Sequence, residues 1–412
     1  MKRRPSLNSL ILVGCLAGVA GGFTVAGLGA GDPVAQGTLY GAKLVGTLFL
    51  DLLRMVLIPL VFSSIVVGVA NLRAHEEMHR VWTLTLGFFL LSMALAILLG
   101  FSAANVFRPG EGMQLEMFAE ATRNYQARQM PLADYIAQFL HGLFDNPFKA
   151  LAQGDILTVV IVALILGVAL VVGGDRYRNL LALVKEIQEI CLLVVGWIMR
   201  LAPFGIGALL LQLVATQRTD LLQSLIHFIA VIIGTTLFHG AVVLPLLLYA
   251  VTRMSPLRFW RGARESLVTA FATSSSAATM PVTLRCAEQH LHVKKDIANF
   301  VIPLGTTVNM DGTALYEAAA ALFVARLAGI ELDLVHQLVV FFVAMLGAIG
   351  APGIPSVGML SMVLVLQSVG LPTEAIAILL PIDRILDTVR TAVNVEGDMV
   401  GSLIVQKLVE KP

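Results

Sequence analysis

The last apolar run of the chain carries a row of side chains that can do chemistry. Acidic, guanidinium and amide groups recur there at intervals of three or four residues, at Asp383, Asp387, Arg390, Asn394 and Asp398. This spacing predicts one face of a helix, with Thr391 at its margin. Because a charge at mid-membrane costs about 2.5 to 3.5 kcal/mol on insertion scales, this face should meet partners rather than lipid.

The partners of this face follow from its groups. Carboxylates can hold cations and ammonium groups, and a guanidinium can clamp a carboxylate in bidentate geometry. The alternative is that the charges only pair with each other, as Asp387 and Arg390 could do. This pairing would leave the other acidic side chains of the row without a partner, and these acids favour bound cations. Glu396 lies on the opposite face and is expected to be solvated or interfacial.

A second polar stripe precedes this helix. Asn309, Thr313 and Glu317 recur at intervals of four, and Gly312 beside Asp311 favours a break in the helix. An unwound turn would free carbonyl oxygens, which hard cations such as sodium prefer as ligands. The alternative, a simple turn at a helix end, is disfavoured because apolar sequence lies on both sides.

Two apolar segments in the same half of the chain are interrupted at bilayer depth. Ser274, Ser275 and Ser276 interrupt the run 259–292, and a tip rich in glycine and proline interrupts the run 333–370. A serine run by itself is equally consistent with a turn, whereas glycines let a tip move as a gate. Paired interrupted segments predict an inverted-repeat transporter with its site near the membrane midplane.

The overall composition excludes most other classes of protein. Of 412 residues, 57% are hydrophobic and only 13% are charged, which is far too apolar for a soluble protein. A net charge of +1 gives no reason to expect nucleic acid as a partner. The three scattered cysteines fit neither a disulfide framework nor a zinc site.

The amino-terminal part of the chain should cross the membrane repeatedly. Apolar runs that meet or approach the length needed for about 30 Å of hydrocarbon cover 8–30, 39–71, 80–107, 156–173, 186–216 and 221–252. Arginine and lysine cluster in alternate loops, so the positive-inside rule predicts a cytoplasmic amino terminus. We expect the first run to be a retained helix, and His227 and His239 to be satisfied interior residues.

Two other classes of function are disfavoured. An intramembrane aspartyl protease needs a GxGD signature, but Asp398 follows Val395-Glu396-Gly397, and no histidine lies near the serine tip to support a serine protease. Interrupted hairpins suit occlusion of a substrate better than a permanent pore.

The serine tip, Asn309-Met310-Asp311-Gly312-Thr313, Gly353-Ile354-Pro355 and the row from Asp383 to Asp398 together resemble the dicarboxylate/amino acid:cation symporter family. That family includes archaeal aspartate transporters, bacterial glutamate carriers and excitatory amino-acid transporters. The resemblance covers nearly the whole chain. It implies an all-α membrane protein with eight transmembrane helices, two re-entrant helical hairpins and inverted repeats, assembled as a homotrimer and working as an elevator.

The resemblance also implies a division of the chain. Residues 1–79 would hold scaffold helices 1 and 2, and 80–107 transport-domain helix 3. Residues 108–220 would hold an external loop and scaffold helices 4 and 5, and 221–412 the remaining transport domain. The protein would lie in a bacterial inner membrane with both termini cytoplasmic.

The resemblance implies a substrate site formed by Ser276, Thr313, Gly353, Ile354, Asp387, Arg390, Thr391 and Asn394. Arg390 would clamp the side-chain carboxylate of the substrate, and Asp387 would hold its ammonium group. Family members that carry dicarboxylates lack this acid, and those that carry neutral amino acids lack the arginine. Together the pair implies L-glutamate or L-aspartate, with length discrimination left open, and no cofactor.

The resemblance implies a first sodium site formed by Gly305, Asn309, Asn394 and Asp398. Thr307 and Met310, with carbonyls near 348–351, would form a second, and Asn309 with Asp311 would contribute to a third. Proton-coupled bacterial members of the family tend to carry Asn where this chain has Asp398 and Leu where it has Met310. The resemblance therefore implies sodium coupling. The alternative is proton-coupled transport of an acidic amino acid or a dicarboxylate.

The chain departs from the family pattern at three places. The stretch Phe89-Leu90-Leu91-Ser92-Met93 lacks usual ligands of a third sodium ion. Glu317 is a candidate proton carrier, because apolar surroundings favour a neutral carboxyl group. Arg384 is a candidate charge compensator beside Asp387, in place of arginines that relatives carry elsewhere.

Overall fold

The computed structural model of this protein describes residues 7–29, 31–71, 79–112, 144–153, 156–216, 219–349 and 358–410. In this part of the chain every regular element is a helix. Stretches long and apolar enough to cross a membrane are Ser9–Leu28, Pro33–Ala70, Arg80–Phe107, Thr158–Met199 and Gln223–Thr252. Most of the expected external loop, 113–143, lies outside the described residues. The described helices are those of an all-α membrane protein.

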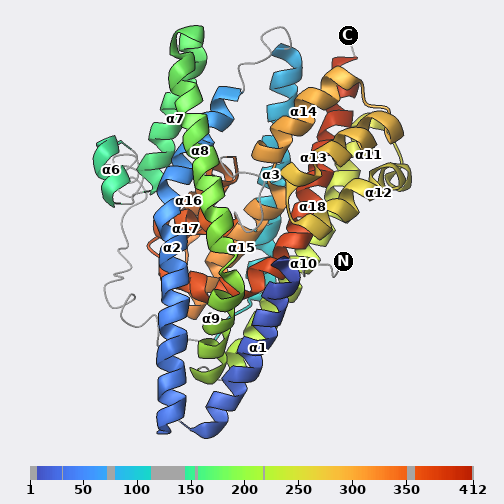
Figure 1. Ribbon diagram of the computed structural model, residues 1–412. Coiled ribbons are helices and arrows are strands. Elements are labelled where there is room, and N and C mark those ends of the chain that lie inside the picture. The colour runs from blue at the N-terminus through green and yellow to red at the C-terminus, as the bar shows by residue number, and fades with distance from the viewer. Residues whose placement is uncertain are drawn as a thin grey trace, which may run out of the picture.

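One group of helices comes from the amino-terminal half of the chain. Its members are α1 (Leu7–Leu28), α2 (Pro33–Asn71), α6 (Pro147–Gln153), α7 (Ile156–Gly173), the 3-10 turn η3 (Gly174–Tyr177), α8 (Arg178–Met199) and α9 (Ala202–Thr216). Helix α2 packs against α7, α8 and α9, and α1 packs along α9. In Figure 1 these helices form the blue and green side of the molecule.

Helices α1 and α9 approach so closely that glycine is required between them. A Cβ atom on Gly18 would overlap the carbonyl group of Gly207, whereas one on Gly27 would have no heavy atom within 4 Å. Gly18→Val should therefore lower the apparent melting temperature in detergent by several degrees, since overpacking costs about 1 to 3 kcal/mol. Gly27→Val in the same helix is the control, and equal melting temperatures for the two variants would contradict this packing.

The second group surrounds the carboxyl-terminal helix. Its members are α3 (His79–Phe107), α10 (Thr219–Phe238), the π-helix η4 (His239–Val243), α11 (Leu244–Thr252), α12 (Pro256–Thr273), α13 (Ser276–Arg285), the π-helix η5 (Cys286–His290), α14 (Lys295–Val308), α15 (Asp311–Leu327), α16 (Leu334–Ile349), α17 (Gly358–Ser368), η6 (Thr373–Ala375) and α18 (Ile376–Val409). Helix α18 packs against α3, α11, α12, α14 and α15, and Figure 1 shows it running in red through this group.

The expected apolar run 186–216 is not one helix. It is divided between α8 and α9, because the amide groups of Arg200 and Leu201 bond to carbonyls three residues back, at 3.1 and 2.8 Å. Pro203 has no amide hydrogen and is favoured near a helix start. The chain therefore tightens into a turn and begins a new helix.

The interruptions expected in the carboxyl-terminal half take three forms. Helices α12 and α13 are joined at Ser274, which has a positive φ of 51°, and Ser275 caps α13 by accepting a hydrogen bond from the Ala278 amide at 3.2 Å. Helices α16 and α17 pack against each other, and their connection, 350–357, lies outside the described residues. Helix α14 ends at Val308 and α15 begins at Asp311.

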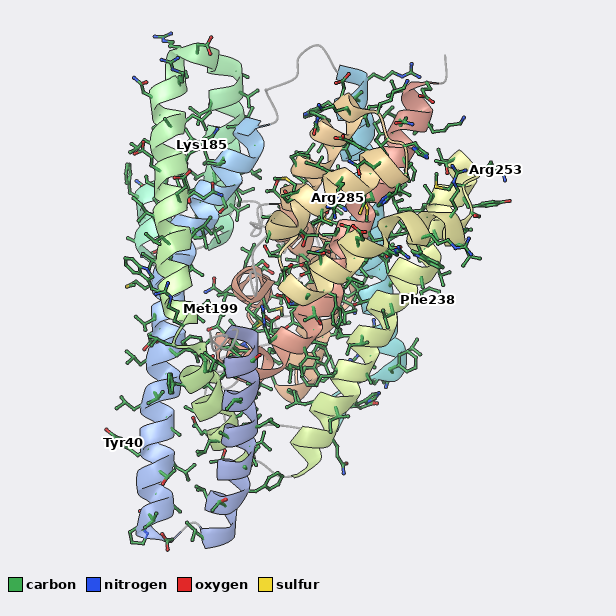
Figure 2. The ribbon with its side chains drawn as sticks, turned by 45° about the vertical axis from the view of Figure 1, so that its right-hand side comes forward. Tyr40, Lys185, Met199, Phe238, Arg253 and Arg285 are labelled. Atoms are coloured by element: carbon green, nitrogen blue, oxygen red, sulfur yellow. The ribbon has the colours of Figure 1, made fainter. Side chains whose placement is uncertain are left out.

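The basic loops gather at one end of the molecule. Figure 1 places the start of α3, the turn η3 and the carboxyl-terminal end of α18 at its upper end. In Figure 2, Lys185 on α8 and Arg253 after α11 lie toward the same end. The basic residues that follow the second, fourth and sixth apolar runs therefore lie toward one end, whereas the group expected before the first run, Lys2, Arg3 and Arg4, lies outside the described residues.

Candidate functional site

The charged face of α18 points into the second helix group rather than toward lipid. Asp383, Asp387, Arg390, Thr391, Asn394 and Asp398 are all buried, and none is more than 5% exposed. The helical period expected from their spacing is therefore present, and helices α3, α14 and α15 supply the surroundings.

Arg390 is held by two acids and an aromatic ring. Its Nη2 donates to Oδ1 of Asp383 at 2.5 Å and to Oδ1 of Asp387 at 3.1 Å. Its Cζ lies 4.1 Å from the centroid of the Tyr316 ring, a favourable cation–π distance. Self-pairing thus occurs, but Nε and Nη1 of Arg390 have no hydrogen-bond acceptor among the residues described. A buried guanidinium with unused donors is suited to receive a carboxylate.

Asp383 has a different role from the one that its place in the row suggests. It was one of the acids expected to be left over for bound cations, but its Oδ1 accepts a hydrogen bond from Arg390. Because the two residues are two helical turns apart, the long arginine side chain can reach back along α18. Tyr316 was not identified from the sequence, where an aromatic residue in an apolar run carries no distinctive signal.

The start of α17 covers the guanidinium. A Cβ atom on Gly358 would lie 3.1 Å from Cγ2 of Thr313 and 3.4 Å from Nη1 of Arg390. The start of α17 therefore lies beside Thr313 and Arg390, two residues of the expected substrate site. Gly353 and Ile354, at its expected tip, lie outside the described residues.

Asn394 links α18 to the break between α14 and α15. Its Oδ1 accepts a hydrogen bond from the Gly312 amide at 2.8 Å, and its Nδ2 lies 3.4 Å from the sulfur of Met310 and 3.5 Å from Oγ1 of Thr313. The break itself falls at Asn309 and Met310. Three of the expected site residues, Met310, Thr313 and Asn394, therefore meet at one point.

The expected role of Gly312 as the cause of the break is wrong, because Gly312 lies within α15. A Cβ atom there would lie 2.8 Å from both Cα and the carbonyl oxygen of Arg390. Gly312 instead allows α15 to approach the backbone of α18.

Asp398 and Asn309 form the centre of the expected first sodium site. Nδ2 of Asn309 donates to Oδ1 of Asp398 at 3.1 Å and to the Asn394 carbonyl at 3.2 Å. Oδ2 of Asp398 is buried and has no hydrogen-bond partner within the described ranges. Gly305 packs directly against this carboxylate. The expected ligands Gly305, Asn309, Asn394 and Asp398 are thus brought together by α14 and α18.

Thr307, the expected ligand of the second sodium ion, is half-buried near the end of α14 and donates to the Leu304 carbonyl at 3.1 Å. The carbonyls expected to complete that site near 348–351 lie partly outside the described residues.

Asp311 accepts hydrogen bonds on both of its oxygens. Oγ of Ser92 donates to Oδ1 at 3.1 Å, and Nε2 of His239 lies 3.0 Å from Oδ2. His239 belongs to the π-helix η4, which locally changes the direction of side chains on this long helix. His239 is buried as expected, but its bond to Asp311 was not predicted. The expectation is wrong for His227, which is exposed on α10.

Glu317 is completely buried on α15 and accepts a hydrogen bond from the hydroxyl of Ser361 on α17. Its Oε2 has no hydrogen-bond partner among the residues that the structure describes. The candidate proton carrier therefore lies between the helix of the NMDGT motif and the second hairpin.

Glu396 was expected to be solvated or interfacial because it lies opposite the row of charged residues on α18. This expectation is wrong. It is 5% exposed, and its Oε1 accepts a hydrogen bond from Nε1 of Trp260 at 2.9 Å. Helix α12 packs on that face of α18, and the absence of a side chain at Gly240 leaves room for the carboxylate.

The remaining expected residues also lie on this side of the molecule. Ser276 begins α13 and is buried, as is Thr391 beside Arg390. Nη1 of Arg384 lies 3.7 Å from Oδ2 of Asp387, so the expected charge compensator reaches its acid.

Comparison with known proteins provides evidence about the family of this chain that does not depend on the geometry of the site. A family model described as "Sodium:dicarboxylate symporter family" matches residues 7–408. The neutral amino acid transporter B(0) of Bos taurus is 32% identical over 431 residues, covering 98% of this chain and 80% of that protein. The neutral amino acid transporter A of Homo sapiens is 32% identical over 446 residues, covering 99% and 83%. A Caenorhabditis elegans protein described as a candidate sodium-dependent excitatory amino acid transporter is 29% identical over 411 residues, covering 89% and 82%.

Proposed function

The chain belongs to the sodium:dicarboxylate symporter family, and we propose that it imports an acidic amino acid, L-glutamate or L-aspartate, coupled to sodium ions. Membership confirms the expected family and confirms that the protein is a transporter of an integral membrane type, not an enzyme. The intramembrane protease alternative is thereby excluded.

The observation that carries the choice of substrate is the buried guanidinium of Arg390. Its Nη1 and Nε have no acceptor in the described part of the chain, and Thr313 and Gly358 close around it. A side-chain carboxylate would satisfy these donors in bidentate geometry, which neutral side chains cannot do. The α-ammonium group would lie against Asp387 and the α-carboxylate near Thr391 and Asn394, with Ser276 and the tip at Gly353 and Ile354 enclosing it.

Neutral amino acids are the second candidate. Two of the relatives above are named neutral amino acid transporters, and Asp387 would serve the ammonium group of any amino acid. Against this candidate stands the cost of leaving two donors of the fully buried Arg390, Nε and Nη1, which have no acceptor among the described residues, unsatisfied when a neutral side chain is bound.

The energy balance favours more than one sodium ion per substrate. A cation that enters down about 100 mV gains about 2.3 kcal/mol, and a tenfold gradient adds about 1.4 kcal/mol. Concentrating a monoanion ten-thousandfold against that potential needs about 7.8 kcal/mol. Two sodium ions supply about 7.4 kcal/mol, just short of this requirement, and two sodium ions with a proton exceed it. Asp398, Asn309 and Thr307 offer oxygen-rich surroundings for the two sodium ions, and Asp311 with its protein donors suits a weak third site.

The proposed mechanism is an elevator. Helices α1, α2, α7, α8 and α9 would form the scaffold, and α3 with α10 to α18 the moving transport domain, in a homotrimer. Most helix packing falls within one or the other group, which supports this division, and the groups meet where α18 packs against α9 and where α7 contacts α16 and α17. The end that collects the basic loops is proposed to be cytoplasmic, with both termini on that side of a bacterial inner membrane.

The deciding experiment is uptake into proteoliposomes with sodium and pH gradients imposed separately. Accumulation of labelled L-glutamate or L-aspartate only with inward sodium supports the proposal. Accumulation driven by protons alone, or of succinate, would support the proton-coupled or dicarboxylate alternative. Preferential uptake of L-alanine or L-serine would support the neutral candidate.

Glu317 is proposed to carry a proton with the substrate. If uptake requires the neutral form, uptake by the native protein should fall as pH rises above neutrality. Glu317→Gln, which resembles the protonated group, should remove this decline while keeping the bond from Ser361. Initial uptake rates between pH 6 and 9 test this, with Glu265→Gln, an exposed residue paired with Arg285, as the control. An unchanged pH profile in Glu317→Gln would reject the role.

A further inference from the structure

Helix α12 exposes one side along its whole length. Leu257, Arg261, Arg264, Val268 and Phe271 recur at intervals of four, three, four and three, which places them on one side of a helix. All five are exposed in the structure, whereas the other side of α12 is buried and packs against α18 and α13. We call these five residues the α12 face.

The polarity of the α12 face changes along the helix. Arg261 and Arg264 lie in the first three turns of α12, and Arg258 is exposed beside them. Val268, which is 69% exposed, and Phe271, which is 52% exposed, follow. Because a helix rises about 1.5 Å per residue, Phe271 lies about 15 Å beyond Arg261 along the axis. A face that contacted only water would be polar throughout, whereas charge followed by apolar surface fits the headgroup and the acyl chain of a lipid.

The three arginines receive no counter-charge from the protein. No ion pair within the described ranges includes Arg258, Arg261 or Arg264. Glu265, the acid next to them, pairs instead with Arg285 at 2.7 Å. Three positive charges therefore gather over about two turns of one helix, and an anionic group is the partner that complements them.

The neighbouring residues place these arginines at the level of the membrane surface. The apolar stretch Gln223–Thr252 ends directly before Arg253, and α12 begins three residues later. The guanidinium of Arg253, labelled in Figure 2, lies 5.5 Å from the centroid of the Tyr249 ring, and Tyr249 is 45% exposed. An exposed tyrosine beside an arginine at the end of an apolar span is typical of the headgroup region. The first turns of α12 therefore start among headgroups, and the exposed apolar residues of its later turns suit acyl chains.

We propose that the α12 face binds an anionic phospholipid of the leaflet at the end where the basic loops gather. The three arginines would hold the phosphodiester of a headgroup that carries no cation of its own, because guanidinium donors match phosphate oxygens in bidentate geometry. Val268 and Phe271 would contact an acyl chain. This inference needs only that the chain lies in a membrane, so it stands or falls separately from the proposed function.

Quenching of a single tryptophan reports which lipid lies at this face. Trp260 lies one turn before Arg264 on α12 and is half-buried, so the full-length protein with Trp82→Phe and Trp197→Phe keeps one reporter beside the site. It would be reconstituted in phosphatidylcholine vesicles that contain brominated phosphatidylcholine or brominated phosphatidylglycerol at equal mole fraction. We expect phosphatidylglycerol to be preferred near Trp260 by about tenfold or more, since each basic residue near an anionic headgroup adds about fivefold in affinity.

Substitutions on α12 should remove this preference. Arg261→Gln should lower it by about fivefold, and Arg261→Lys, which keeps the charge, should retain most of it. Arg258→Gln, Arg261→Gln and Arg264→Gln together should bring the two lipids to within about twofold of each other. Equal melting temperatures in neutral detergent check that the variants are folded. A control of equal charge replaces three exposed lysines at the same end of the molecule and should keep the native preference: Lys294→Gln, Lys295→Gln and Lys407→Gln.

The inference would be overturned if the two lipids quench Trp260 equally when the arginines are present, or if the triple arginine variant keeps the preference. It would equally be overturned if the lysine control loses the preference as the arginine variant does. Lack of quenching by either lipid would show that protein, such as a second copy of this chain, covers the face. Displacement of phosphatidylglycerol by inorganic phosphate would show a site for a free anion rather than for a lipid. None of these results depends on uptake of an amino acid, so a failure of the proposed function leaves this test unchanged.

Discussion

Replacing Arg390 with alanine should nearly abolish sodium-driven uptake of L-glutamate and L-aspartate. Truncating one partner of a buried, hydrogen-bonded charge pair costs about 2 to 5 kcal/mol. At about 1.4 kcal/mol per tenfold change, this corresponds to a loss of about 30- to 4000-fold in apparent affinity. The effect should be near the upper end, because Arg390 is completely buried and water cannot take over its bonds to a carboxylate.

The same change should alter selectivity as well as affinity. Asp387 remains in Arg390→Ala and can still hold an ammonium group, so the ratio of L-alanine to L-glutamate uptake should rise. Competition of unlabelled amino acids against labelled substrate measures this ratio. Retention of more than a tenth of native L-glutamate uptake would contradict the carboxylate clamp.

Arg390→Lys separates the loss of the guanidinium geometry from the loss of charge. Lysine keeps the counter-charge for Asp383 and Asp387 but offers a point charge in place of a planar fork. It should therefore fold as the native protein does and bind L-glutamate with intermediate affinity. Thermal unfolding in detergent checks that Arg390→Ala, which leaves two buried acids with less compensation, has remained folded under the conditions of the uptake assay.

Asp398→Asn is expected to raise the sodium concentration that half-saturates uptake by about tenfold or more, since hydrogen bonds and contacts to a charged group contribute about 1.5 to 3 kcal/mol. The change preserves size and keeps an oxygen that can accept the bond from Asn309, now 3.1 Å long. It removes only the negative charge, so a weaker response to sodium would report the loss of a cation ligand rather than of packing.

Sodium titration of initial uptake rates at fixed pH measures this effect. Asp296→Asn is the matched control, because Asp296 is exposed in the first turn of α14 and lies on a helix that contributes to the same site. An unchanged sodium dependence in Asp398→Asn would remove Asp398 from the cation site, and uptake by the native protein that ignores sodium would reject sodium coupling altogether.

Local spacing was sufficient to predict which residues of the last helix share a face. Intervals of three and four place Asp387, Arg390 and Asn394 on one side of any α-helix, and the cost of charge in hydrocarbon requires that this side be covered. The serine turn between α12 and α13 was also predictable, because it depends on residues adjacent in the chain. A break near Asn309 was predictable too, but the glycine expected to cause it, Gly312, lies within α15. The apolar composition determined that the protein belongs in a membrane.

Only the tertiary structure decided which partner each of these groups meets. The pairing of Asp311 with His239, 72 positions away, depends on how α15 packs against α10, which η4 follows directly. The burial of Glu396 under Trp260 depends on α12, and Gly312 is needed because α18 passes so close to it. The period of a helix determines the direction in which a side chain points. It does not determine which residue lies opposite, because that residue belongs to a helix far away in the sequence, and the sequence does not show how the two helices pack.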